Sequence, residues 1–248
     1  MNDLRALSGL SGRHDRYEHA RGIMAGEETR KRILIAAEQL FAERGISSTS
    51  MRALTKAADV NLAAVHYHFG SKEALLDAVI EFRAAPMNLA RIAALDAHAA
   101  ERGKEPLQVD CIFRAFLMPA IQSVIESPEG AAHLPRLFAR LEAQPPEVLE
   151  AIYRRHLGDV TRRFVEALQK ALPDLPKELI AERFRLAMGS IFTLFSGNSE
   201  LDFIPGHSPQ VVSIEEKLES VIAFVTGGIS APASARRAPG QRVEENTP

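Results

Sequence analysis

Apolar residues recur at intervals of three and four positions along most of the chain, whereas alternation with a period of two is rare. Such spacing places apolar side chains on one face of an α-helix. The pattern therefore predicts an all-α fold of roughly nine helices. The expected helices cover about 28–44, 51–58, 62–69, 72–95, 107–126, 129–143, 146–172, 177–196 and 213–227.

Residues 50–72 are expected to form two short helices joined by a tight turn, followed by the start of a third helix. Thr49 or Ser50 can cap the first helix and Asn61 the second, because their side-chain oxygens accept backbone N–H bonds. Asp59 suits the turn, since Asp tolerates a left-handed backbone better than most residues. This arrangement predicts a helix-turn-helix.

The second short helix has one inward and one outward side. Val65 can pack inward, and Ala63 and Tyr67 then point the opposite way at about 100° per residue. Ala64 and His66 lie on the flanks of the outward side. Small side chains, an imidazole and a phenol make a surface that suits close approach to another molecule.

The third helix begins with a cation, which opposes the helix dipole. Ser71 is expected to cap this helix, and Lys72 is its first residue. An external anion, such as a DNA phosphate, would bind both the free N–H groups and the ammonium group of Lys72. A lysine that is merely solvated is the alternative, and on this residue alone the two readings are about equally good.

Residues 27–82 resemble the N-terminal domain of the TetR family of transcriptional regulators. The resemblance includes ETRKRILIAAEQLFAERG and ends in HYHFGSKEALL. Within the family, NLAAV and YHFGSKEALL are most similar to the PsrA-type subgroup. Two positions depart from the family pattern: Asp59, where most members have Gly, and His66, where many have Tyr.

Base reading in the major groove is expected from the outward side of the second short helix. Ala63, Ala64 and His66 are candidates, because alanine methyls can meet thymine methyls and His66 can donate to an acceptor edge. Leu62 is a further candidate, and packing inward is the alternative for it because it lies three positions before Val65. Arg52 is the candidate for a guanine contact.

Phosphate contacts would fix the position of the protein on the duplex. The candidates combine hydroxyl, imidazole and ammonium groups around the helix-turn-helix. They are Thr49, Ser50, Tyr67, His68 and Lys72.

The remainder of the chain carries no further motif, so its role follows from the resemblance. The TetR family implies a helical regulatory domain that dimerises through its last two long helices and contains an effector pocket. Fatty-acyl or similar molecules are conceivable ligands, and ordinary core packing is the stronger alternative for the same residues. The candidate pocket residues are Phe113, Arg114, Phe116, Leu117, Met118, Ile121, Leu137, Phe138 and Arg140.

Composition shifts divide the chain into four expected parts. Residues 1–26 are expected to form a flexible arm, residues 27–86 the helix-turn-helix domain, residues 87–230 the effector-binding and dimerisation domain, and residues 231–248 a disordered tail. Pro86 is expected to kink or interrupt its helix.

Composition also narrows the function class. The net charge is −2, so DNA affinity requires a local basic patch, which 44–72 supplies. The lone Cys111 fits a reducing cytosol, no stretch suits a membrane span, and a cytoplasmic location is expected. Nucleotide-binding, metalloprotease and cysteine-nucleophile patterns are absent, so neither an enzyme nor a cofactor or metal is expected.

The predicted function is therefore a homodimeric repressor that leaves a palindromic operator when a small hydrophobic or acyl-type ligand binds. Two alternatives remain. A ligand-independent architectural DNA-binding protein would need no cavity in its second domain. An apolar-ligand carrier with a vestigial DNA-binding head would lack salt-dependent DNA affinity.

Overall fold

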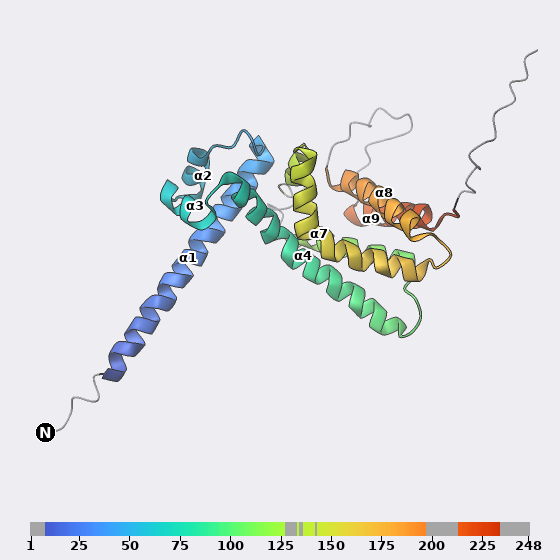
Figure 1. The fold of residues 1–248 in the computed structure, drawn as a ribbon, viewed down its shortest axis with the longest axis horizontal. Helices are drawn as coiled ribbons and strands as arrows, with labels where there is room; N and C mark the ends of the chain where they lie inside the picture. The colour runs from blue at the N-terminus through green and yellow to red at the C-terminus, as the bar shows by residue number, and fades with distance from the viewer. Residues whose placement is uncertain (1–7, 127–132, 134–135, 142, 197–212, 234–248) are drawn as a thin grey trace, which may run out of the picture. The chain divides into compact units, whose positions relative to one another are not determined.

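The computed structural model of the protein describes residues 8–126, 133, 136–141, 143–196 and 213–233. Within these ranges the chain contains helices and no strand, which confirms the predicted all-α fold. Residues 136–141 are helical as well. The labelled helices in Figure 1 and the adjoining α5 are α1 (Ser8–Arg44), α2 (Met51–Ala58), α3 (Leu62–Phe69), α4 (Lys72–Arg102), α5 (Val109–Glu126), α7 (Pro146–Ala171), α8 (Lys177–Ser196) and α9 (Ile214–Ser230).

Helix α1 is longer than its apolar pattern indicates. Residues 8–26 are helical, where an irregular arm was expected. No proline interrupts Ser8–Arg44, so helix formers such as Ala, Arg and Glu extend the helix beyond its buried stripe. The helix ends at Gly45, whose φ of +87° is a left-handed conformation that favours glycine after a helix. Residues 1–7 of the expected arm and 234–248 of the expected tail lie outside the described residues.

Helix α4 continues through Pro86 to Arg102, so the expected interruption does not occur. The turn expected between residues 96 and 106 lies directly after it. There, the N–H of Gly103 donates to the carbonyl of Ala99 at 3.1 Å, and Gly103 has a φ of +65°.

The chain forms two compact units. One contains residues up to Arg91 together with Pro119–Val160, and the other contains Ile92–Met118 together with the residues from Thr161 onward. Helices α4, α5 and α7 each contribute residues to both units.

In the first unit, the helix-turn-helix packs on an apolar core. Phe41, Leu54, Val65 and Leu75 are almost completely buried in it. Leu137, Leu141 and Ile152 belong to the same core, although the sequence pattern placed them in the second domain. Buried Glu38 adds a polar link between α1 and α4, because Arg83 Nε donates to both of its carboxylate oxygens at 2.9 Å.

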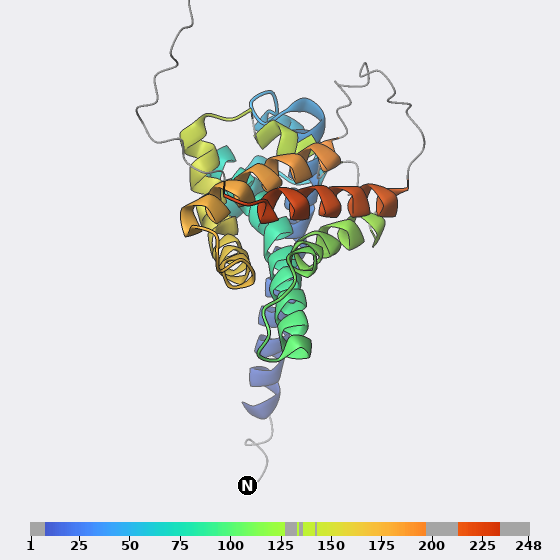
Figure 2. The ribbon, with the colours of Figure 1, turned by 90° about the vertical axis from the view of Figure 1, so that its right-hand side faces the viewer.

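The second unit has an aromatic core. Phe116 packs edge-on against Phe164 and Phe184 with ring centroids 5.1 and 6.0 Å apart, and Phe113 stacks on Phe184 at 6.5 Å. Helices α8 and α9 lie side by side in this unit (Figure 2). Arg183 of α8 fixes the end of α9, because its Nη1 donates to the Ile229 carbonyl at 2.8 Å.

Candidate nucleic-acid interface

Local hydrogen bonds define the helix-turn-helix. Ser50 Oγ accepts from the N–H of Ala53 at 3.2 Å, and Asn61 Oδ1 accepts from the N–H of Ala64 at 2.8 Å. Between the two helices Asp59 adopts a left-handed backbone with φ 52° and ψ 54°. Both predicted caps and the predicted turn residue are therefore confirmed.

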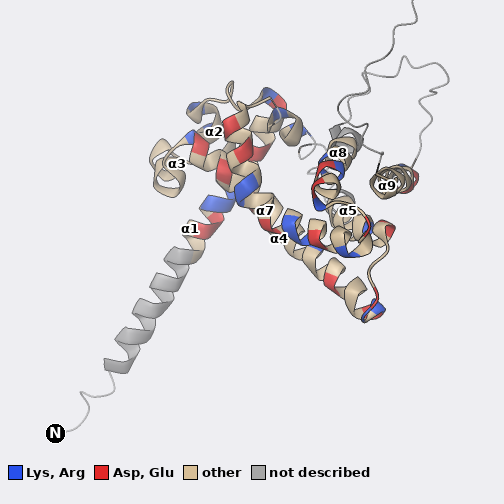
Figure 3. Ribbon diagram, turned by 45° about the vertical axis from the view of Figure 1, so that its right-hand side comes forward, with Lys and Arg blue, Asp and Glu red and all other residues tan. Residues whose placement is uncertain are grey.

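Helix α3 presents its small and aromatic residues outward. Val65 is 1% exposed and anchors the helix in the core, whereas Tyr67 is 86% exposed. Ala63 and His66 are also exposed. Leu62 is 49% exposed, so it lies on the outward side rather than packing inward. The helix contains no Lys, Arg, Asp or Glu, as Figure 3 shows by its colour.

The end of α3 fixes the imidazole ring of His66. The N–H of Gly70 donates to the His66 carbonyl at 2.9 Å, and Nδ1 of His66 lies 2.9 Å from the Gly70 carbonyl oxygen. Gly70 has a φ of +72°, a conformation that L side chains rarely adopt. The side chain and main chain of His66 are thus both tied to the residue that ends the helix.

Arg52 and Ser50 are exposed beside this helix, but Thr49 is not. Thr49 is 1% exposed, and its hydroxyl donates to the carbonyls of Gly45 at 2.8 Å and Leu40 at 3.2 Å. The predicted phosphate contact of its hydroxyl is therefore wrong for this conformation. Thr49 instead closes the connection between α1 and α2.

Lys72 joins the start of α4 to the loop after α1. Its Nζ donates to the carbonyl oxygen of Ser47 at 3.0 Å, and no carboxylate holds it among the described contacts. Two of its three ammonium protons remain available for an anion. Ser71 caps α4, since its Oγ accepts from the N–H of Ala74 at 3.1 Å. The partner Ser47 lies 25 positions away, so sequence spacing gave no signal for this contact.

The first turn of α4 also carries a carboxylate. Hydrogen bonds from its own backbone N–H and from Ser71 lower the pKa of Glu73, so this exposed side chain is anionic near neutral pH. Glu73 supports the helix dipole that Lys72 opposes.

Tyr67 and His68, the remaining candidates for phosphate contacts, lie in a row of aromatic contacts. The ring of Tyr67 packs edge-on against half-buried His68 with centroids 5.1 Å apart, and His68 lies 6.1 Å from Phe69. Arg30 of α1 lies over the Phe69 ring at 5.4 Å, which adds a cation that the sequence analysis did not select.

A charged cluster joins α4 to α7 within the first unit. His156 is buried, with Nε2 2.9 Å from Asp77 Oδ1 and Nδ1 2.6 Å from Glu81 Oε2. Arg155 pairs with Asp77 at 2.8 Å, and Asn88 donates to the His156 carbonyl at 2.6 Å. Burial opposes ionisation of Asp77 most strongly, but the bonds from His156 and Arg155 together lower its pKa.

The structure does not bring the predicted effector-pocket residues around one cavity. Residues 113–118 belong to the second unit, whereas Ile121, Leu137, Phe138 and Arg140 belong to the first. Phe113, Phe116, Leu117, Ile121 and Leu137 are buried core residues. These five residues therefore follow the alternative given above, ordinary core packing.

The remaining members of that set have structural contacts as well. Arg114 forms an ion pair with Glu219, which raises the pKa of Arg114 and lowers that of Glu219. Phe138 packs against the core of the first unit, and the Arg140 side chain lies near Gly45. Met118 is half-buried.

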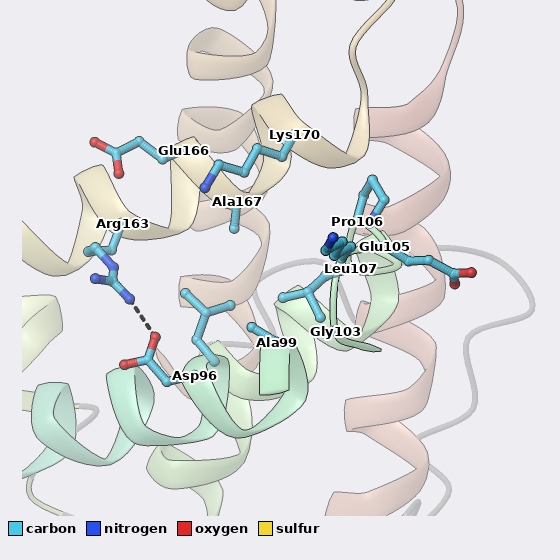
Figure 4. Close-up of a pocket in the computed structure, with 12 residues that line it drawn as sticks. Asp96, Ala99, Gly103, Glu105, Pro106, Leu107, Arg163, Glu166, Ala167 and Lys170 are labelled. Carbon is cyan, nitrogen blue, oxygen red and sulfur yellow. Dashed lines mark hydrogen bonds and ion pairs between the residues drawn. The ribbon is translucent and has the colours of Figure 1, made fainter. Parts of the chain in front are cut away.

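A cavity of about 590 Å³ lies elsewhere in the second unit, between the last turns of α4, the segment before α5, and α7 (Figure 4). Leu95, Ala99, Leu107 and Ala167 supply its apolar wall. Its charged lining includes an ion pair between Arg163 and Asp96. The other charged lining residues are Lys104, Glu105, Glu166 and Lys170.

Among the residues that the structure describes, no group of three or more His, Cys, Asp and Glu side chains could hold a metal ion. None of the described helices has the length and apolar character needed to cross a membrane.

Two family models match the chain. The one described as "Bacterial regulatory proteins, tetR family" matches residues 33–79, and the one described as "Tetracyclin repressor-like, C-terminal domain" matches residues 114–228. The two matches together cover more than half of the chain.

Characterised regulators are similar to this chain over a shorter length. The HTH-type transcriptional regulator UidR of Escherichia coli K12 is 44% identical over 54 residues, which are 22% of this chain and 28% of UidR. SrpR of Pseudomonas putida is 38% identical over 63 residues, which are 25% of this chain and 30% of SrpR. The chain thus aligns with less than a third of each relative.

Solved structures share the fold over most of the chain. The fatty acid degradation regulator FadR from Bacillus halodurans has a TM-score of 0.58 at 14% identity, covering 81% of this chain and 95% of FadR. The ketosteroid transcriptional regulator KstR2 of Mycobacterium tuberculosis has a TM-score of 0.53 at 19% identity, covering 80% of this chain and 93% of KstR2. With both family models matched on this fold, the chain belongs to the TetR family.

Proposed function

We propose that the protein is a homodimeric transcriptional repressor that binds a palindromic operator and leaves it when a small ligand binds. The observation that carries this proposal is the outward side of α3. Leu62, Ala63, His66 and Tyr67 are exposed there, while Val65 anchors the helix in the core. A short, uncharged helix surface with small side chains can enter the major groove closely.

Groups on both sides of α3 support this docking. Arg52 is exposed on α2 and is the candidate for a bidentate guanine contact. Ser50, Tyr67, His68 and Lys72 remain the candidates for phosphate contacts, which position the protein without reading sequence.

A second copy of the chain is the proposed partner of α8 and α9. Leu186 on α8 is 56% exposed and Phe224 on α9 is 69% exposed. Exposed Gly189, Ala223 and Gly227 flank these side chains and leave room for close helix approach. A two-fold axis through this surface would place two α3 helices about one DNA turn apart, roughly 34–36 Å.

The cavity between α4 and α7 is the proposed effector site. Its apolar wall suits a hydrophobic or acyl chain, and the ammonium groups of Lys104 and Lys170 suit an acidic head group. The similarity of the α3 region to the PsrA-type subgroup also favours an acyl-type effector. A cavity in this unit favours a ligand-responsive regulator over an architectural DNA-binding protein.

Ligand binding would act through the helices that line the cavity. Asp96 and Ala99 belong to α4, whose first turns carry the helix-turn-helix core, and α7 is tied to those turns through His156. A ligand releases DNA only if it binds the DNA-free conformation more tightly than the DNA-bound one.

Selection of bound duplexes from a random library tests the proposal. The full-length protein should enrich an inverted repeat with half-sites about one helical turn apart, ~10–10.5 base pairs centre to centre. Acyl ligands of increasing chain length should then reduce the affinity for that duplex. Failure to enrich any sequence would refute the proposal, and enrichment without any ligand effect would favour the architectural alternative.

A further inference from the structure

Among the contacts of the described residues, one ring nitrogen of His66 is engaged and the other is not. Nδ1 lies 2.9 Å from the carbonyl oxygen of Gly70, a normal length for an N–H···O bond. A carbonyl oxygen only accepts hydrogen bonds, so Nδ1 carries the proton. In a neutral imidazole the other nitrogen, Nε2, is then an acceptor.

The main chain holds His66 in this state. The Gly70 N–H donates to the His66 carbonyl while Nδ1 of His66 donates to the Gly70 carbonyl, so two bonds join the same two residues. Turning the ring over would place the Cδ2–H group against the Gly70 oxygen and lose this bond, and the other tautomer would place the Nδ1 lone pair against it. The ring is therefore oriented before any DNA binds.

An acceptor in the major groove has few partners. Only cytosine N4 and adenine N6 present amino donors there, whereas guanine O6 and N7 and thymine O4 accept. Phosphate oxygens also accept. We infer that His66 is a specificity-determining residue that reads the exocyclic amino group of a cytosine or an adenine. This inference rests on the proposed docking of α3 and reverses the donor role expected from the sequence.

Modified duplexes and two asparagine variants test the inference. The duplex selected by the wild-type protein is remade position by position, with purine replacing adenine or pyrimidin-2-one replacing cytosine. Each analogue lacks only the exocyclic amino group. Affinity is measured at pH 8 by fluorescence anisotropy, so that histidine side chains are mainly neutral.

His66→Asn is the informative variant, because its amide can still reach the Gly70 carbonyl but has no atom in the place of Nε2. His98→Asn is the matched control, since His98 lies on α4 outside the helix-turn-helix and its side chain is 38% exposed. Circular dichroism spectra show whether each variant remains folded.

At one position of each half-site, removal of the amino group should weaken wild-type binding about two- to tenfold, as expected for one neutral hydrogen bond. The same replacement should have no effect on His66→Asn, and the full effect should persist in His98→Asn. An equal loss for His66→Asn and wild type at every position would overturn the inference, as would no loss for wild type at any position. Absence of any selected duplex would instead refute the proposed function, and the inference with it.

Discussion

Nδ1 of His156 on α7 lies 2.6 Å from a carboxylate oxygen of Glu81 on α4. The side chain of His156 is 2% exposed, and its other nitrogen faces Asp77. Both ring nitrogens of His156 therefore lie at hydrogen-bond distance from carboxylate oxygens of α4. These contacts link α4, the helix that follows the helix-turn-helix, to α7.

Replacing His156 should destabilise the protein more than replacing an exposed histidine. His156→Gln keeps a polar side chain but cannot satisfy both carboxylates, so the free energy of unfolding should fall by about 1–3 kcal/mol. Urea denaturation followed by circular dichroism measures this change. His98→Gln is the control, because the His98 side chain is 38% exposed and its Nδ1 lies 3.7 Å from Glu101. Its effect should stay within about 0.5 kcal/mol. Equal effects would show that the link contributes no stability.

Acid should weaken the same link through Asp77. The folded-state pKa of Asp77 lies below its ordinary value of 3.8, so its contribution is fully present above that value and is lost as the pH falls through the folded-state pKa. Asp77→Asn should therefore be less stable than wild type at pH 6 and approach it below pH ~3.8. Unfolding free energies measured across this range check the sign. A difference that stays constant with pH would contradict the assigned pKa shift.

Lys72→Ala should weaken binding to every DNA sequence. Removal of one phosphate contact should lower the slope of log affinity against log salt by about 0.9. Anisotropy titrations at several salt concentrations measure this slope for the variant and for wild type. Lys72→Arg keeps a cation and a donor for the Ser47 carbonyl, so it should retain most of the slope.

Arg52→Ala provides the contrast to Lys72→Ala. Loss of a bidentate guanine contact should cost about 1–3 kcal/mol at one base pair and leave nonspecific affinity nearly unchanged. If both variants weakened all sequences alike, Arg52 would be a phosphate ligand instead.

Phe224→Glu should disrupt the proposed dimer. A carboxylate in the middle of an apolar contact between two helices is costly to bury, whereas at an exposed site it costs almost nothing. Analytical ultracentrifugation should therefore find folded monomers of Phe224→Glu and dimers of wild type. Ser220→Glu, at another exposed position of α9, tests how far the contact extends. A wild-type monomer, or a dimeric Phe224→Glu variant, would place the partner elsewhere.

Local chemistry allowed the helix-turn-helix to be predicted from the sequence. Ser50, Asp59 and Asn61 act on their own neighbours within a few residues, so their roles can be read from spacing. Thr49 could not be placed this way, because its burial, with bonds to the carbonyls of Gly45 and of Leu40 in the preceding helix, depends on tertiary packing.

Long-range packing set the limits of prediction elsewhere. The sequence shows apolar positions such as Leu137 and Ile152 on two separate helices, but periodicity does not say which core each helix joins. The predicted pocket failed for the same reason: Phe113 and Phe116 fill a core, and the cavity is lined mainly by small and charged residues such as Ala99 and Lys170.

The most direct test of the account is a comparison of Ala63→Glu with Ala90→Glu. Both alanines are exposed on helices of the first unit, so both variants should fold with little loss of stability. Anisotropy titration with the selected duplex should show DNA binding lost in Ala63→Glu, because a carboxylate would face the bases and phosphates, and unchanged in Ala90→Glu. Wild-type affinity in a folded Ala63→Glu variant would contradict the claim that this side of α3 enters the major groove.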